Sequence, residues 1–179
     1  MNRISVVGTS GSGKTTFAAE LARILGHRHI ELDVLHWAPN WVEKPDDEFL
    51  ELVREATQGE RWITDGNYSK TQLTVLSLVD TVIWLDYPFL TVWRRAIWRT
   101  FSRVFTREKI WHDNVETWRT AFSRYGIPAW VVRSYGKNKR KYSGMIERGY
   151  PEGVYWVRLR SPKATETFLQ RLGDRSSDA

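Results

Sequence analysis

A glycine-rich segment near the start of the chain constrains the fold more than any other feature. Residues 8–15 read Gly-Thr-Ser-Gly-Ser-Gly-Lys-Thr and match the phosphate-binding pattern G-x-x-x-x-G-K-[ST]. Residues 4–7 before it suit a buried strand, and the spacing of Phe17, Leu21 and Leu25 after it predicts a helix. Where a strand turns sharply into a helix, several backbone N–H groups point at one anion. The segment therefore predicts a site for a nucleoside triphosphate.

The residues of this loop have different expected roles. Lys14 is expected to reach the outer phosphates of ATP as a catalytic point charge, and Thr15 is expected to offer its hydroxyl to Mg²⁺. The expected cofactors are therefore ATP and Mg²⁺. Nucleotide contacts are assigned to Gly8, Thr9, Ser10, Gly11, Ser12, Gly13, Lys14, Thr15 and Thr16.

Size and composition indicate one ordinary domain. The chain has 179 residues, of which 41% are hydrophobic and 27% charged, with a net charge of +6. It has no cysteine, which excludes disulfides and thiolate metal sites. No apolar run approaches the roughly 18 residues of a membrane span, and no signal peptide precedes the loop. We expect a single cytoplasmic domain over residues 1–179, as a monomer or homodimer, without membrane contact.

Short apolar strands alternate with helical patterns along the chain. Strands are expected over residues 3–7, 28–33, 61–65, 81–86 and 154–160, and helices over 14–25, 46–58, 70–78, 89–104, 115–134 and 163–172. This alternation predicts an α/β fold whose parallel sheet is covered by helices on both faces, a three-layer arrangement. Ligands of such sheets bind beyond the carboxyl ends of the strands.

Two aspartates are expected at those strand ends. Asp33 closes the second expected strand and Asp65 the third. A phosphoryl-transfer enzyme needs one carboxylate to hold Mg²⁺, often through water, and another to deprotonate the acceptor. Either aspartate could be the base, and Asp65 is the candidate for the metal. Strand-end aspartates also serve as turn formers or helix caps, and Asp86 is expected to be such a cap. Glu31 shares a strand face with Asp33 and is a weaker candidate for the site.

Arginines recur along the helix expected over residues 89–104. Arg95, Arg99 and Arg103 are spaced at i, i+4 and i+8, which stacks like charges on one side. An anionic ligand would offset their repulsion, so Arg95 and Arg99 are expected to contact phosphate in catalysis. For Arg103, a solvated surface with Glu108 as the nearest neutralising neighbour is the better account.

Trp37 and Trp41 follow Asp33 in a loop at the mouth of the expected cleft. Their indoles could stack on a ring-shaped acceptor or shield it from water, or could simply pack in the loop. The neighbouring His36 is expected to be polar surface.

Taken together, these motifs resemble the P-loop small-molecule kinases of the adenylate kinase-like group, nearest the DNA-topology-modulation-protein-like branch. The matching segments span nearly the whole chain: residues 8–16, 32–37, 62–68, 84–88 followed by Arg95 and Arg99, and 158–162. The resemblance implies a five-stranded parallel sheet in the order 2-3-1-4-5 and transfer of the γ-phosphate of ATP. It also implies a helical lid around residues 101–125 and an acceptor-binding segment around 34–60.

The resemblance also implies individual roles. Arg95 and Arg99 would hold phosphates, Asp33 would contact the acceptor, and Arg160 would lie beside the adenine. The chain departs from adenylate kinases after Asp65-Gly66, where Asn67, Tyr68 and Ser69 replace the arginine-bearing segment that grips the acceptor's phosphate. An AMP acceptor would then need Lys70 or Arg54 as a substitute.

The sequence therefore predicts an ATP-dependent phosphotransferase with a small hydroxyl- or phosphate-bearing acceptor, a nucleoside or nucleotide in the first place. The alternative is an ATP-binding regulator associated with nucleic acid, based on the basic residues 137–141. A GTPase is disfavoured, because the only Asn-Lys pair continues as Arg140-Lys141 instead of the guanine-reading motif.

Overall fold

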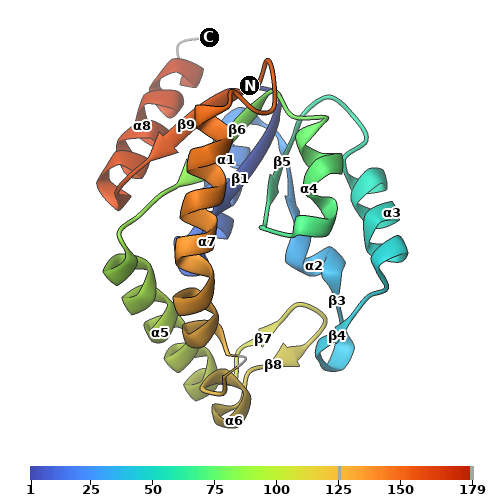
Figure 1. Cartoon of the computed structure of the whole chain (residues 1–179), viewed down its shortest axis with the longest axis vertical. Helices are drawn as coiled ribbons and strands as arrows, with labels where there is room; N and C mark the ends of the chain where they lie inside the picture. The colour runs from blue at the N-terminus through green and yellow to red at the C-terminus, as the bar shows by residue number, and fades with distance from the viewer. Residues whose placement is uncertain (125, 178–179) are drawn as a thin grey trace.

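The computed structural model describes residues 1–124 and 126–177, and a five-stranded parallel sheet lies at its centre (Figure 1). Its order is β2-β5-β1-β6-β9. The strands are β1 (Arg3–Gly8), β2 (Arg28–Glu31), β5 (Trp62–Asp65), β6 (Thr81–Leu85) and β9 (Tyr155–Leu159). In chain order these are the five expected strands, so the α/β fold and the order 2-3-1-4-5 are confirmed.

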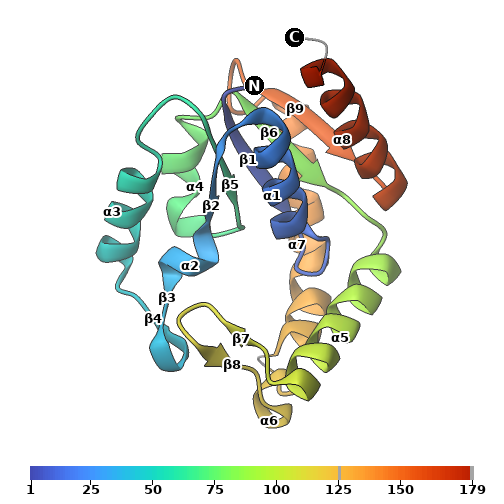
Figure 2. The same ribbon diagram turned by 180° about the vertical axis from the view of Figure 1, so that it is seen from behind.

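Helices cover both faces of the sheet, because the three central strands β1, β5 and β6 are almost fully buried and need cover on each side. On one face α1 (Lys14–Leu25) and α8 (Pro162–Ser177) pack over residues that include Ile4, Val6 and Ile83. On the other face α3 (Asp46–Ala56), α4 (Ser69–Leu76) and the end of α7 (Ile127–Glu147) enclose Trp62, Val82 and Trp84. Figure 2 shows α1 in front of the sheet and α7 behind it.

The remaining elements lie beyond the carboxyl edge of the sheet (Figure 2). They are α2 (Leu32–His36), the hairpin of β3 (Trp37–Ala38) and β4 (Val42–Glu43) with the 3-10 turn η1 (Pro39–Trp41), α5 (Phe89–Thr106), the hairpin of β7 (Lys109–Ile110) and β8 (Asn114–Val115), and α6 (Trp118–Ala121). The lid expected around residues 101–125 corresponds to the end of α5, the β7–β8 hairpin and α6, although Tyr125 lies outside the described residues. Its closure stays a prediction.

Two strand-end aspartates differ from expectation, Asp33 in its position and Asp86 in its role. β2 ends at Glu31, and Asp33 lies in the short helix α2. Asp86 follows β6 but does not cap α5, whose N-cap is Pro88. Instead the carboxylate of Asp86 accepts two hydrogen bonds from Arg158, at 2.9 and 2.6 Å.

The single helix expected over residues 115–134 was also wrong. The chain forms β8, then α6, and begins α7 at Ile127 after an N-cap at Gly126. Thr117 and Thr120 form a capping box that begins α6. A Cβ on Gly126 would lie 1.8 Å from the carbonyl oxygen of Ala121, so the connection is too tight for any side chain there.

None of the helices in the described part of the chain is both long and apolar enough to cross a membrane.

Candidate active site

The phosphate-binding loop joins β1 to α1 and packs closely against its neighbours. Gly11 has a φ of +86°, and a Cβ there would lie 2.5 Å from the carbonyl oxygen of Val92 in α5. Gly8 has a φ of +152°, and a Cβ there would lie 2.8 Å from the carbonyl oxygen of Leu85. Both positions therefore require glycine, and the loop backbone is left open as a cradle for an anion.

Asn67 braces this loop from the side. Its Oδ1 accepts a hydrogen bond from the backbone N–H of Gly8 at 3.2 Å, and its Nδ2 donates to the carbonyl of the same residue. The hydroxyl of Tyr142, buried in α7, donates to the same Oδ1 at 3.0 Å. Asn67 thus stabilises the loop at the position where adenylate kinases carry a different segment.

Lys14 lies in the first turn of α1, directly after the glycines of the phosphate-binding loop. Its Nζ lies 3.4 Å from the carbonyl oxygen of Thr9. Burial lowers the pKa of Lys14, whereas the charges of Asp65 and Asp33 act in the opposite direction. The charge of the ammonium group therefore interacts with those of both predicted catalytic aspartates.

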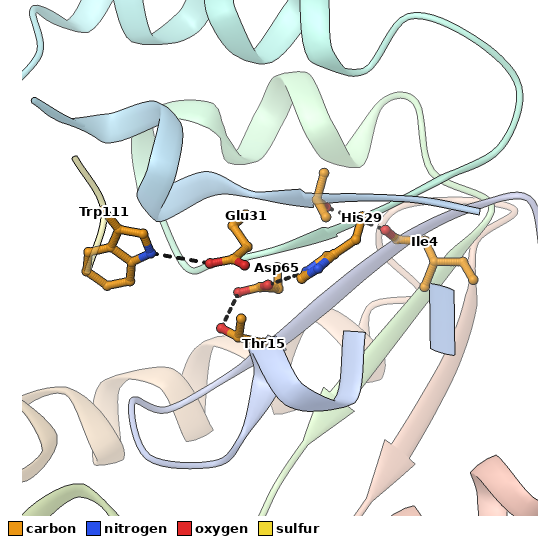
Figure 3. A network of polar contacts seen from close by, with 7 residues as sticks. Ile4, Thr15, His29, Glu31, Asp65 and Trp111 are labelled. Carbon is orange, nitrogen blue, oxygen red and sulfur yellow. Dashed lines mark hydrogen bonds and ion pairs between the residues drawn. The ribbon is translucent and has the colours of Figure 1, made fainter. Parts of the chain in front are cut away.

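Asp65 is almost fully buried, with 2% of its surface exposed, and both of its oxygens have partners (Figure 3). Oδ1 accepts a hydrogen bond from the hydroxyl of Thr15 at 3.1 Å, and Oδ2 lies 2.7 Å from Nε2 of His29. His29 lies on β2, the strand next to β5. These contacts fix the carboxylate beside the end of the phosphate-binding loop.

The oxygen atoms of Thr15 and Asp65 fit Mg²⁺, which prefers oxygen ligands and keeps several waters. Among residues 1–124 and 126–177, no group of three or more His, Asp or Glu could hold a metal by itself. A cation here would therefore be shared with water and with phosphate oxygens.

Asp33 lies in α2, where its Oδ1 accepts a hydrogen bond from the hydroxyl of Tyr68. Burial raises the pKa of Asp33, and the hydrogen bond from Tyr68 and the charge of Lys14 oppose this rise. Burial and the neighbouring Asp33 raise the pKa of Tyr68, so its phenol stays protonated and donates. Tyr68 thus engages only one oxygen of Asp33, whereas both oxygens of Asp65 have partners.

The three stacked arginines of α5 divide into two groups. Arg103 lies 3.7 Å from a carboxylate oxygen of Glu108, the expected neighbour, and 3.7 Å from one of Glu116. With 17% of its side chain exposed, it is not the solvated surface residue that we expected. Burial lowers the pKa of Arg99, and this guanidinium interacts electrostatically with Asp33 and Lys14. Arg99 is therefore coupled by charge to Asp33 and to Lys14.

Arg95 belongs with Arg99 at the phosphate-binding loop. Its guanidinium lies over the ring of Tyr87, 5.6 Å from the centroid, and 3.8 Å from the position of a Cβ on Gly13. Thr16 and Arg160 are exposed; Arg160 lies just beyond the end of β9. Neither Thr16 nor Arg160 takes part in the contacts around Asp33 and Asp65 that are described above.

Aromatic side chains connect the expected acceptor-binding segment to the β7–β8 hairpin. Ring centroids of Trp37 and Trp41 are 5.6 Å apart, and those of Trp41 and Trp111 are 6.2 Å apart. The indole Nε1 of Trp111 donates a hydrogen bond to Glu31 at 3.3 Å (Figure 3). Glu31, the weaker sequence candidate, thereby joins the site.

Asn114 holds the two segments together. This residue is 3% exposed, and its Oδ1 accepts a hydrogen bond from the backbone N–H of Trp41 at 2.8 Å. Its Nδ2 donates to the carbonyl of Ala38 at 3.0 Å and to that of Trp111 at 2.7 Å. The β7–β8 hairpin is therefore fastened to residues 37–43, far from it in sequence.

His36 is not polar surface, as we had expected, but is 5% exposed. Its ring centroid lies 4.9 Å from those of Trp37 and Phe49 and 4.5 Å from that of Tyr68. Burial lowers the pKa of His36. The histidine therefore supports Tyr68, the partner of Asp33, from behind.

The sequence analysis missed His29, Asn67, Tyr142, Trp111 and Asn114. A signal existed for His29, because it alternates with Glu31 along β2 and so shares its face of the sheet. Asn67 follows Asp65-Gly66 directly and was treated only as a departure from a pattern. Trp111 and Asn114 had no local signal, because their partners are far away in sequence.

The chain has similarities to one curated protein and to one solved structure. No protein-family model matches the chain. The uncharacterized protein YqaC of Bacillus subtilis (strain 168) is 30% identical over 103 residues, which cover 56% of this chain and 57% of YqaC. An unliganded crystal structure of a sugar kinase from Janibacter sp. HTCC2649 is similar with a TM-score of 0.50 and 19% identity, over 98% of this chain and 92% of that chain. This likeness is one of fold alone.

Proposed function

We propose that the protein is an ATP-dependent phosphotransferase that moves the γ-phosphate of ATP to a hydroxyl group of a small acceptor. One observation carries the proposal: Thr15 donates a hydrogen bond to Asp65 at the end of the phosphate-binding loop. The charge of the neighbouring Lys14 interacts with those of Asp65, Asp33 and Arg99. The similarity in fold to a sugar kinase supports it.

The donor half of the site is the loop itself. Backbone N–H groups of the loop bind the phosphates of ATP, except those of Gly8 and Ser12, which donate to Asn67 and Thr9. Lys14 neutralises the outer phosphates. Arg95 and Arg99 meet the charge that develops on the transferred phosphoryl group. The Thr15 hydroxyl, and Asp65 through water, would hold Mg²⁺, which would neutralise further phosphate charge.

The acceptor half uses Asp33 as the general base. Both oxygens of Asp65 are engaged, by Thr15 and by His29, whereas Asp33 is held through one oxygen by Tyr68. The hydroxyl proton of the acceptor passes to the carboxylate of Asp33, and the hydroxyl oxygen bonds to the γ-phosphorus. The bond from that phosphorus to the bridging oxygen breaks, and ADP leaves with the electron pair.

A coupled ADP-release assay across nucleosides, nucleotides, sugars and small alcohols tests this function. We expect ADP release that depends on one acceptor class and that disappears in the variant Lys14→Met. Lys163→Met, which changes an exposed lysine at the start of α8, is the matched control. ATP hydrolysis that no acceptor accelerates, or no ADP release at all, would contradict the proposal.

A second function, binding of nucleic acid, is favoured by one observation. Lys137, Lys139 and Arg140 are exposed on α7, and no ion pair is found for them within the described ranges. Phosphate backbones bind such surfaces in a salt-dependent way. Salt-sensitive binding of DNA or RNA that the double variant Lys137→Glu/Arg140→Glu weakens would support it, and no affinity at low salt would exclude it.

A further inference from the structure

The acceptor side of the site differs in charge from the donor side. Glu31 and Asp33 lie two residues apart at the carboxyl end of β2 and the start of α2, and Asp65 stands opposite Glu31 in the sheet register. Figure 3 shows the carboxylates of Glu31 and Asp65 close together. An anionic group on the acceptor would meet these carboxylates as well as the phosphates of ATP, and like charges repel at such short range.

Cations that could compensate this charge on the acceptor side are already paired. Lys70 forms an ion pair with Asp46, and Arg54 lies 3.2 Å from Glu51. These were the two residues that could have replaced the missing phosphate-gripping arginine. Arg103, the next candidate, is shared between two glutamates.

What the acceptor side does offer is hydrogen-bond acceptors next to aromatic rings. A carboxylate accepts two hydrogen bonds side by side, which matches adjacent hydroxyl groups. Trp111 binds Glu31 through its N–H, so the indole ring stands beside the carboxylate, and Trp41 packs edge-on against that ring. Flat rings bury the apolar C–H face of a sugar ring or stack on a base.

We propose that the acceptor is an uncharged molecule with adjacent hydroxyl groups, bound by Glu31 and the ring of Trp111. Free sugars and the ribose of nucleosides share this chemistry. The inference rests on the phosphotransferase function proposed above. In this proposal Glu31 determines which acceptor binds, whereas Asp33 accepts the proton of the reacting hydroxyl.

The experiment compares four acceptor classes with the wild-type protein and ATP: uncharged sugars and polyols, nucleosides, sugar acids, and phosphorylated sugars or nucleoside monophosphates. We expect turnover in the first or the second class, and which of them it is identifies the source of the diol. A carboxylate or phosphate group on the same carbon skeleton is expected to lower kcat/KM by about 100-fold or more. The reason is that its negative charge would be repelled by the carboxylates of the acceptor side.

The variant Glu31→Gln keeps the oxygen that binds Trp111 but removes the charge. We expect the KM of the uncharged acceptor to rise about tenfold with little change in the KM of ATP, since one charge-assisted hydrogen bond is lost on the acceptor alone. The penalty against the charged analogue should fall about tenfold. A merely structural glutamate would not change this ratio. Glu147→Gln, at the exposed end of α7, is the control.

The outcomes separate the two proposals. Efficient turnover of a charged acceptor overturns this inference and leaves the phosphotransferase function intact. If no acceptor causes ADP release, the phosphotransferase function is overturned. In that case calorimetry measures whether an uncharged diol binds to protein loaded with a non-hydrolysable ATP analogue, and saturable binding still supports the inference. Absence of such binding overturns it.

Discussion

Thr15 donates a hydrogen bond to Asp65 over 3.1 Å, although 50 residues separate them along the chain. β1 and β5 are adjacent parallel strands, and their register sets Val6 opposite Asp65. The loop that follows β1 and the carboxylate that ends β5 therefore meet at one edge of the sheet. This contact joins the expected nucleotide site to the expected metal site.

We expect Asp65→Asn to lower kcat by about 10²–10³-fold, the range for one preorganised electrostatic group in a site. The asparagine still accepts from Thr15 but carries no charge for the cation. The Mg²⁺ dependence of ATP-analogue binding, measured by calorimetry, should weaken in parallel. Asp47→Asn, at an exposed position in the first turn of α3, should change neither quantity.

His29 is expected to act as a positioning residue for Asp65, because its Nε2 lies 2.7 Å from Oδ2 of that aspartate. Loss of such a partner typically costs about 10–100-fold in metal affinity or activity. His29→Ala should therefore raise the Mg²⁺ concentration for half-maximal rate and lower kcat. His29→Gln, whose amide can donate to the same oxygen, should recover part of both. Equal losses in the two variants would contradict the role.

Glycine at position 11 is needed for a different reason from glycine at position 59. Both have positive φ, but a Cβ on Gly11 would strike the carbonyl of Val92, whereas Gly59 has nothing within 4 Å. Gly59→Ala should lower the free energy of unfolding by about 1–2 kcal/mol through backbone strain alone. Gly11→Ala should cost about 1–3 kcal/mol more from the clash, and also weaken ATP binding. Urea unfolding of both variants measures the difference.

The sheet could be predicted because its determinants are local. Short apolar runs, the glycines after β1 and the alternation with helices together fix five parallel strands. The break between α6 and α7 also had a local signal, Gly126 followed by a proline at the second position of α7, which is typical of a helix start. The apolar residues keep helical spacing across this signal, so the pattern alone predicts one continuous helix.

The position of Asp33 could not be read from the pattern. Residues 28–33 suit a continuous strand, but β2 ends where its pairing with Asp65 ends, at Glu31. The next residues turn into α2, whose Leu32 and His36 are buried. Contacts between residues far apart in the chain determine where β2 ends. The contacts between β7–β8 and residues 37–43 are of the same kind, so the sequence does not predict them.

Asp33→Asn is expected to stabilise the fold at neutral pH while abolishing acceptor-dependent turnover. Burial raises the folded-state pKa of Asp33 above the ordinary 3.8, so its ionised form destabilises the folded state. This unfavourable contribution is absent below pH 3.8, grows as the pH rises through the folded-state pKa, and is complete above it. The free energy of unfolding of the variant should thus exceed that of the wild type at neutral pH but not in acid. An unchanged difference across this range would contradict the assignment.

Tyr68→Phe tests the same carboxyl through activity. The hydrogen bond from Tyr68 lowers the pKa of Asp33, so its loss should raise that pKa further. Because a general base acts only when deprotonated, the acid limb of the kcat/KM profile should move to higher pH in this variant. Tyr155→Phe, at an exposed position of β9, should leave the limb in place.

Asn114→Ala should loosen the β7–β8 hairpin and the acceptor-binding segment together. The buried side chain makes three hydrogen bonds, to Trp41, Ala38 and Trp111, and leaving such groups unpaired costs about 1–3 kcal/mol. Amide hydrogen exchange should increase in residues 37–43 and 109–115 at once, while the sheet stays protected. The acceptor KM should rise with little change in the KM of ATP, because Trp111 then no longer stays beside Glu31. Increased exchange in the hairpin alone would show that the two segments are not coupled through this residue.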